Sequence, residues 1–118
     1  MKTPASSLYM LLLHQPHGAG PHPTAAQMRQ IMERFGVWME DIRAQGLLVS
    51  SHGLKPKGKV LRGPRGATIS DGPYAETKEI IGGYILIKAG SMARALRVAR
   101  GCPGLDYRLA VEVRPVKH

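Results

Sequence analysis

The chain has 118 residues, with 17 Lys and Arg against 8 Asp and Glu, so its formal net charge is +9. This length fits one domain spanning residues 1–118 and excludes multidomain machinery, a long coiled coil and a polytopic membrane protein. An apolar fraction of 43% also excludes wholesale disorder. The basic charge is compatible with a polyanionic partner, or with nothing more than a soluble, self-repelling surface.

The cysteine content and the apolar runs indicate in which cellular compartment the protein is expected. Cys102 is the only cysteine, so no intrachain disulfide can form, which fits a reducing environment. We expect its thiol to be a small core group. The apolar run at residues 8–13 is shorter than a signal peptide or a membrane helix requires. We therefore expect a cytoplasmic protein with no membrane partner.

The first half of the chain predicts a strand, a loop and a long helix. Residues 7–15 form the strand, and the Gly- and Pro-rich segment 16–23 forms the loop. Thr24 and Gln27 have the spacing of a capping box, and Gly46 is placed to end the helix in a left-handed conformation. Apolar residues recur every three or four positions and predict the buried face: Met28, Ile31, Met32, Phe35, Met39 and Ile42.

The second half predicts mostly strands. A short strand at 47–51 precedes a hairpin, whose strands 59–62 and 67–70 flank a four-residue turn. The strand at 80–88 contains Gly82-Gly83, which indicates a bulge or a close backbone approach. Ser91 caps a second helix, whose expected inner face is Met92, Ala95, Leu96 and Ala99. Alternating residues at 105–114 predict the last strand.

This order of elements predicts an α+β fold of ferredoxin-like topology, with both helices on one face of the sheet. In the last predicted strand, Arg108, Glu112 and Arg114 alternate with apolar residues. If the apolar set packs against the helices, the charged set points outward. A second subunit could then close that face, and we therefore expect a homodimer in the form of an α/β barrel with a polar-lined cavity.

The segment Asp71–Glu79, DGPYAETKE, is more specific than turn propensity requires. Together with Gly82-Gly83-Tyr84 and the terminal residues 111–116, it resembles the YCII-related superfamily. Within that superfamily it is similar to the branch with a DGPF motif, here with Tyr74 in place of Phe. Residues 9–12 resemble the opening strand of these proteins, and Gly53-Leu54 resembles the start of their hairpin region.

The resemblance implies a dimeric α/β barrel, in agreement with the order of elements. It also implies a possible enzyme, since some relatives are thought to use a His–Asp pair in a cleft. Members of the DGPF branch are often associated with alternative sigma factors of the extracytoplasmic type. Two features depart from the family pattern: the second helix is basic instead of acidic, with Arg94, Arg97 and Arg100, and His52 precedes Gly53.

Eight residues are candidates for the site, each with an alternative structural role. The expected catalytic residues are Asp71, His52, Glu76 and Lys78, and the expected ligand-binding residues are Tyr74, Arg114, Glu112 and His14. Asp71 could instead stabilise a turn, and Glu76 and Lys78 could form a surface ion pair. Tyr74 could be a packing residue. The strand charges could form an ion-pair ladder at a dimer interface.

The expected chemistry follows from these residue types. His14 and His52 titrate near neutral pH and could pair with Asp71, and Asp71 or His52 would act as the base. Arg114 would hold an anionic group. Glu79 is expected to be structural. His17 and His22 have the spacing H-x4-H with no Cys or acid nearby, which is a weak metal pattern. Nothing in the sequence requires a cofactor or a metal.

The sequence therefore predicts a small-molecule-binding protein or an enzyme, with an anionic small molecule as the favoured ligand. The alternative is a non-catalytic regulatory module linked to transcription, or a basic protein that contacts nucleic acid. A nucleic-acid partner is disfavoured, because the chain has no recognised binding motif and only 5% aromatic residues for base stacking.

Overall fold

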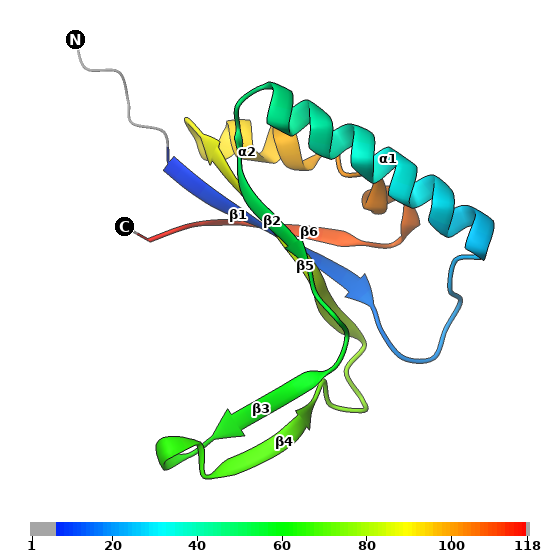
Figure 1. The fold of residues 1–118 in the computed structure, drawn as a ribbon, viewed down its shortest axis with the longest axis vertical. Coiled ribbons are helices and arrows are strands. Elements are labelled where there is room, and N and C mark those ends of the chain that lie inside the picture. The colour runs from blue at the N-terminus through cyan, green and yellow to red at the C-terminus, as the bar shows by residue number, and fades with distance from the viewer. Residues whose placement is uncertain (1–6, 118) are drawn as a thin grey trace.

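A computed structural model describes residues 7–117 of the chain, which fold into mixed helices and antiparallel strands (Figure 1). No helix within this range is long and apolar enough to cross a membrane. The elements in chain order are β1 (Ser7–Pro16), α1 (Ala25–Ala44), β2 (Leu48–Gly53), β3 (Gly58–Arg62), a 3₁₀ turn (Pro64–Gly66), β4 (Thr68–Gly72), β5 (Glu79–Ala89), α2 (Met92–Ala99), a second 3₁₀ turn (Pro103–Tyr107) and β6 (Ala110–Pro115).

Four strands form one sheet in the order β2-β5-β1-β6, and each pair of adjacent strands is antiparallel. Strands β3 and β4 form a separate two-stranded sheet. Both helices contribute side chains to one core on the same face of the four-stranded sheet. The expected α+β class is confirmed, and the arrangement is compatible with a ferredoxin-like fold.

Helix α1 begins and ends as its sequence predicts. The Thr24 hydroxyl accepts a hydrogen bond from the Gln27 backbone N–H, and the Gln27 side chain accepts one from the Thr24 N–H, so the capping box is complete. Gly46, just beyond the helix, has φ +73°, the left-handed conformation that favours glycine. The helix is held to the core by its C-terminal half, where Trp38 and Ile42 are buried.

Alternation along the central strands places one set of side chains against the helices. Tyr9, Leu11 and Leu13 of β1 are buried, and the intervening residues are only half-buried. Strand β5 contributes Ile85 and Ile87 opposite them. Helix α2 completes the core with Ala95 and Ala99, next to Cys102, whose thiol pKa is raised by burial.

The Gly82-Gly83 pair produces the predicted irregularity in β5. Leu13 pairs with Gly83 and His14 with Ile81, so Gly82 is an extra residue opposite β1. A Cβ at Gly83 would lie 2.9 Å from the His52 carbonyl oxygen, so β2 and β5 approach closely because this residue has no side chain. The bulge also shifts the alternation of β5 relative to β1 beyond this point.

The prediction of a last strand over 105–114 is wrong in its first half. Residues 103–107 form a 3₁₀ turn, because Pro103 has no amide hydrogen and the buried Gly104 lets the chain turn tightly. The Leu109 N–H donates to the Gly104 carbonyl at 3.0 Å and closes this turn. Arg108 has φ +70° and lies outside β6, so it does not share a strand face with Glu112 and Arg114.

The inner faces of both helices also differ from their predictions. On α2, Met92 and Leu96 are exposed, because the small residues Ala95 and Ala99 make the close contact with the core. On α1, Ile31 is buried as predicted, but Met28 and Met32 are exposed where the N-terminal half of the helix borders a cavity. These two methionines therefore do not belong to the core.

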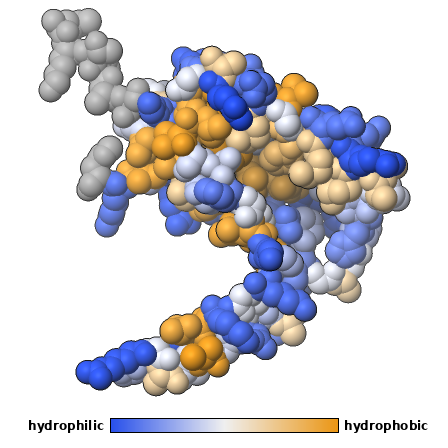
Figure 2. All heavy atoms as spheres, viewed as in Figure 1, coloured by the Kyte–Doolittle hydropathy of each residue, from blue (hydrophilic) through white to orange (hydrophobic). Residues whose placement is uncertain are grey.

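The β3–β4 hairpin projects away from the four-stranded sheet (Figure 1). Leu61 and Ile69 face each other across its two strands, and they are 60% and 64% exposed. Apolar atoms are accordingly visible along this projection in Figure 2. A lone two-stranded hairpin is only marginally stable in water, and this apolar pair is left uncovered within one chain.

Candidate functional site

The sheet face turned away from the helices carries a cluster of charged side chains near the end of β1. His14 alternates with the buried Leu13, so its ring points away from the core. Its Nε2 lies 2.8 Å from Oε1 of Glu112, and its Nδ1 lies 3.2 Å from Oε1 of Glu79. Glu112 also accepts hydrogen bonds from the guanidinium of Arg114, with Nε at 2.8 Å. We call His14, Glu79, Glu112 and Arg114 the His14 cluster.

Strand register explains why these residues meet. Strand β6 pairs with β1 so that Glu112 lies opposite Leu12 and Ala110 opposite His14. Glu112 is thus a diagonal neighbour of His14 on the same face, within reach of its long side chain. Glu79 opens β5 opposite Pro16, on the other side of β1. The two carboxylates consequently flank the imidazole from two different strands.

The electrostatics of the cluster follow from these contacts. The hydrogen bond from His14, and then that from Arg114, hold the pKa of Glu112 below its usual value. A neutral imidazole has one donor nitrogen and one acceptor nitrogen, whereas both nitrogens of a protonated ring are donors. The cluster therefore combines an imidazole, two carboxylates and a guanidinium.

His52 lies on the same open face, on β2. It pairs with Tyr84 of β5, and its Nδ1 is 2.9 Å from the Tyr84 hydroxyl. The two rings are tilted, with centroids 5.7 Å apart. Both sequence-predicted histidines are thus on one face of the sheet, but each has its own set of partners. Tyr84 was not among the predicted site residues, although its place after Gly82-Gly83 was part of the resemblance.

Asp71 and Tyr74 have partners within the hairpin. Asp71 pairs with Lys59 across the two strands and forms an ion pair with its ammonium group. The Arg62 guanidinium lies over the Tyr74 ring at 5.4 Å, a cation–π contact. Among the described residues, no hydrogen bond or ion pair joins Asp71 to a histidine. A catalytic role for Asp71 stays a prediction.

Glu76 and Lys78 are exposed in the segment between β4 and β5. They line a hollow of about 470 Å³ together with the loop that follows β1 and with Arg108. A hydrogen bond of 2.8 Å from the His17 N–H to the Lys78 carbonyl joins the two loops. The structure thus separates the predicted residues into three places: the open sheet face, the hairpin and this hollow.

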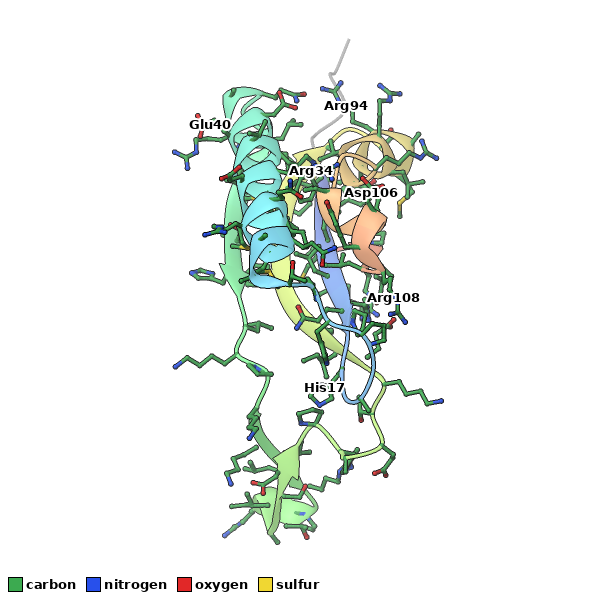
Figure 3. The ribbon with its side chains drawn as sticks, turned by 90° about the vertical axis from the view of Figure 1, so that its right-hand side faces the viewer. His17, Arg34, Glu40, Arg94, Asp106 and Arg108 are labelled. Carbon is green, nitrogen blue, oxygen red and sulfur yellow. The ribbon has the colours of Figure 1, made fainter. Side chains whose placement is uncertain are left out.

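A cavity beneath α1 was not predicted. It has a volume of about 720 Å³ and lies between the N-terminal half of α1 and the sheet. The 3₁₀ turn at 103–107 borders it, and Arg34 of α1 reaches this turn with a 2.9 Å ion pair to Asp106. Figure 3 shows these two side chains pointing toward one another from their separate elements. The sequence signal was the methionine pair on α1, which we assigned to the core.

The remaining candidates have no shared site. Arg94, Arg97 and Arg100 are exposed on and just after α2. Within residues 7–117, no group of three or more His, Cys, Asp or Glu side chains has an arrangement suited to a metal ion. In the His14 cluster, the carboxylates bind opposite ring nitrogens and do not converge on one point.

Comparison with known proteins gives one clear relationship. A search of curated proteins found no match. The sequence matches the family described as the YCII-related domain over residues 8–118, which includes every strand and helix except the first residue of β1. On this match, the chain belongs to the family of YCII-related domains.

Proposed function

We propose that this YCII-related domain binds a small polar molecule on the open face of its sheet and that His14 exchanges a proton with it. The observation that carries the proposal is the position of His14, half-buried on an uncovered sheet face with a carboxylate at each ring nitrogen. Imidazole is the side chain best suited to accept and release a proton near neutral pH.

The neighbours of His14 have complementary roles in this proposal. Glu112 orients the ring through Nε2, and Arg114 fixes the Glu112 carboxylate from its other side. Glu79 contacts the second ring nitrogen and is 55% exposed, so a bound molecule can replace it there. The exposed Arg114 guanidinium favours a ligand with an anionic group, since its planar donors match a carboxylate or a phosphate.

A second copy of the chain would close this site. Apolar side chains Met10, Leu12 and Leu86 are only half-buried on the open face, which neither helix covers. Burying this face against another sheet, about 10 Å away, would form the barrel that the order of elements predicts. The projecting hairpin, with exposed Leu61 and Ile69, supplies a second surface that needs a partner. We therefore place the site at a homodimer interface.

Ligand binding to His14 can be tested by NMR with a panel of small carboxylates and phosphates. We expect a binding compound to shift the His14 ring resonances, and we expect His14→Gln to abolish its binding. Arg114→Gln should weaken the binding of anionic compounds, and Arg97→Gln, on the outer surface of α2, is its matched control. Unchanged binding by His14→Gln would contradict the proposal.

The dimer needs its own measurement. Light scattering at micromolar concentration should give twice the chain mass of 12.8 kDa. Leu12→Arg, at the centre of the open face, should shift the mass toward that of one chain, because it would bury an unpaired charge in the interface. A wild-type monomer under these conditions would refute the closed barrel.

A further inference from the structure

The cavity beneath α1 shares no residue with the His14 cluster, and its size is that of a small-molecule site. We propose that it is a second binding site, which takes a molecule with an apolar body and one anionic group. The anionic group would contact Arg108, and the apolar body would lie between α1 and the sheet. This proposal does not depend on the function proposed for the open face.

The walls of the cavity are mainly apolar. Helix α1 contributes Met28, Met32 and Phe35, and the sheet contributes Leu13 and Ile85. Met28 and Met32 are 44% and 61% exposed, although they lie on the side of the helix that borders the cavity. A ligand would cover this apolar surface, which gives a hydrophobic driving force for binding. Methionine side chains adapt their shape and make favourable contacts with aromatic rings.

The cavity remains between α1 and the sheet because the helix is held at other points. Trp38 and Ile42 anchor its C-terminal half in the core. Closer to its N-terminus, Arg34 forms an ion pair with Asp106 and a hydrogen bond to the Tyr107 hydroxyl. These contacts hold α1 to the 3₁₀ turn at the border of the cavity, so the site is formed before any ligand binds.

Arg108 supplies the charge that selects the ligand. It lines the cavity, and no carboxylate lies within ion-pair distance of it among residues 7–117. Its φ of +70° is uncommon for a residue other than glycine, and such conformations concentrate at functional sites. An unpaired guanidinium beside an apolar cavity matches a ligand with an anionic oxygen group.

Two fluorescent probes separate the apolar and the ionic contributions. 1-Anilinonaphthalene-8-sulfonate has an apolar body with one sulfonate, and N-phenyl-1-naphthylamine has the same rings without the charge. We expect both to bind the wild-type protein. Arg108→Asn should weaken the sulfonate probe by about tenfold and leave the neutral probe within about twofold, because only the charged hydrogen bond is lost. Asparagine tolerates positive φ, so this variant should fold.

The position of the probes is tested by substitutions on α1. Met32→Gln should weaken both probes, because it makes the cavity wall polar. Val37→Gln is the matched control, since Val37 is 73% exposed and does not line the cavity. His14→Gln should leave both probes unaffected, which distinguishes this site from the open face. The proposal is overturned if neither probe binds, if Met32→Gln has no effect, or if Arg108→Asn does not separate the two probes.

Discussion

Glu112 accepts a hydrogen bond from His14 at 2.8 Å, although the two residues are 98 positions apart in the chain. Only the pairing of the first strand with the last brings them together. Glu112 is also bound by Arg114, so its carboxylate is stabilised in the charged form from two directions. This contact has consequences for stability as well as for the proposed proton transfer.

The lowered pKa of Glu112 predicts a specific loss of stability in acid. Its usual value is 4.5, and the folded value is below this. In the unfolded chain this carboxyl has its usual pKa of 4.5. The stabilisation is therefore fully present above that pKa and is lost as the pH falls through the lower pKa of the folded protein. Urea midpoints measured from pH 6 downward should fall less for Glu112→Gln than for the wild type. Glu33→Gln, exposed on α1, is the control. Parallel pH profiles for wild type and Glu112→Gln would contradict this contribution.

Two glycines should respond to alanine in opposite directions. Gly83→Ala places a methyl group 2.9 Å from the His52 carbonyl oxygen, which is backbone and cannot move without shifting β2. We expect destabilisation by about 1–3 kcal/mol. Gly36→Ala, in the middle of α1 with no atom within 4 Å of the new methyl, should stabilise the protein by about 0.5–1 kcal/mol. Urea denaturation followed by circular dichroism measures both, and equal effects at the two positions would refute the close approach of the strands.

Local sequence signals predicted the parts of the fold that local chemistry determines. The capping box at Thr24 needs only residues three apart, and the bulge at Gly82 needs only a residue without a side chain. The start of β6 was predicted too early in the chain. The alternation of residues 105–109 continues the strand pattern, whereas Pro103 and Gly104 impose a turn. The apolar pattern of α1 likewise does not show that Met28 and Met32 border a cavity.

The candidate site was predicted as a set of residues but not as an arrangement. His14, Glu112 and Arg114 were each identified, and the structure brings these three together. Glu79 was expected to be structural, yet it contacts His14. The partner of Asp71 is Lys59, because the hairpin register places them opposite each other. Contacts of this kind depend on strand pairing over long sequence separations, which periodicity does not specify.

Trp38 should be much more sensitive to substitution than the exposed side of α1. Its indole N–H donates to the Val98 carbonyl at 3.1 Å, and its ring packs edge-on against Phe35 with centroids 5.5 Å apart. Trp38→Phe removes the hydrogen bond and leaves space beside α2, so we expect a loss of about 2–3 kcal/mol in unfolding free energy. Val37→Ala, on the exposed side of the same helix, should change it by less than about 0.5 kcal/mol. Thermal or urea unfolding monitored by circular dichroism compares the two, and similar losses would contradict the role of Trp38.

If a second copy of the chain covers the β3–β4 hairpin, the hairpin should become more ordered as the protein concentration rises. Its apolar pair Leu61 and Ile69 is exposed within one chain, and two strands alone are marginally stable. Amide hydrogen exchange should therefore be slow in β3 and β4 at high protein concentration and should accelerate on dilution, while β1 and β5 stay protected. Replacing both Leu61 and Ile69 with Thr should preserve strand propensity but remove the protection at high concentration. Hairpin protection that is independent of both concentration and these substitutions would mean that the chain stabilises its hairpin alone, and the hairpin would then give no support to the dimer.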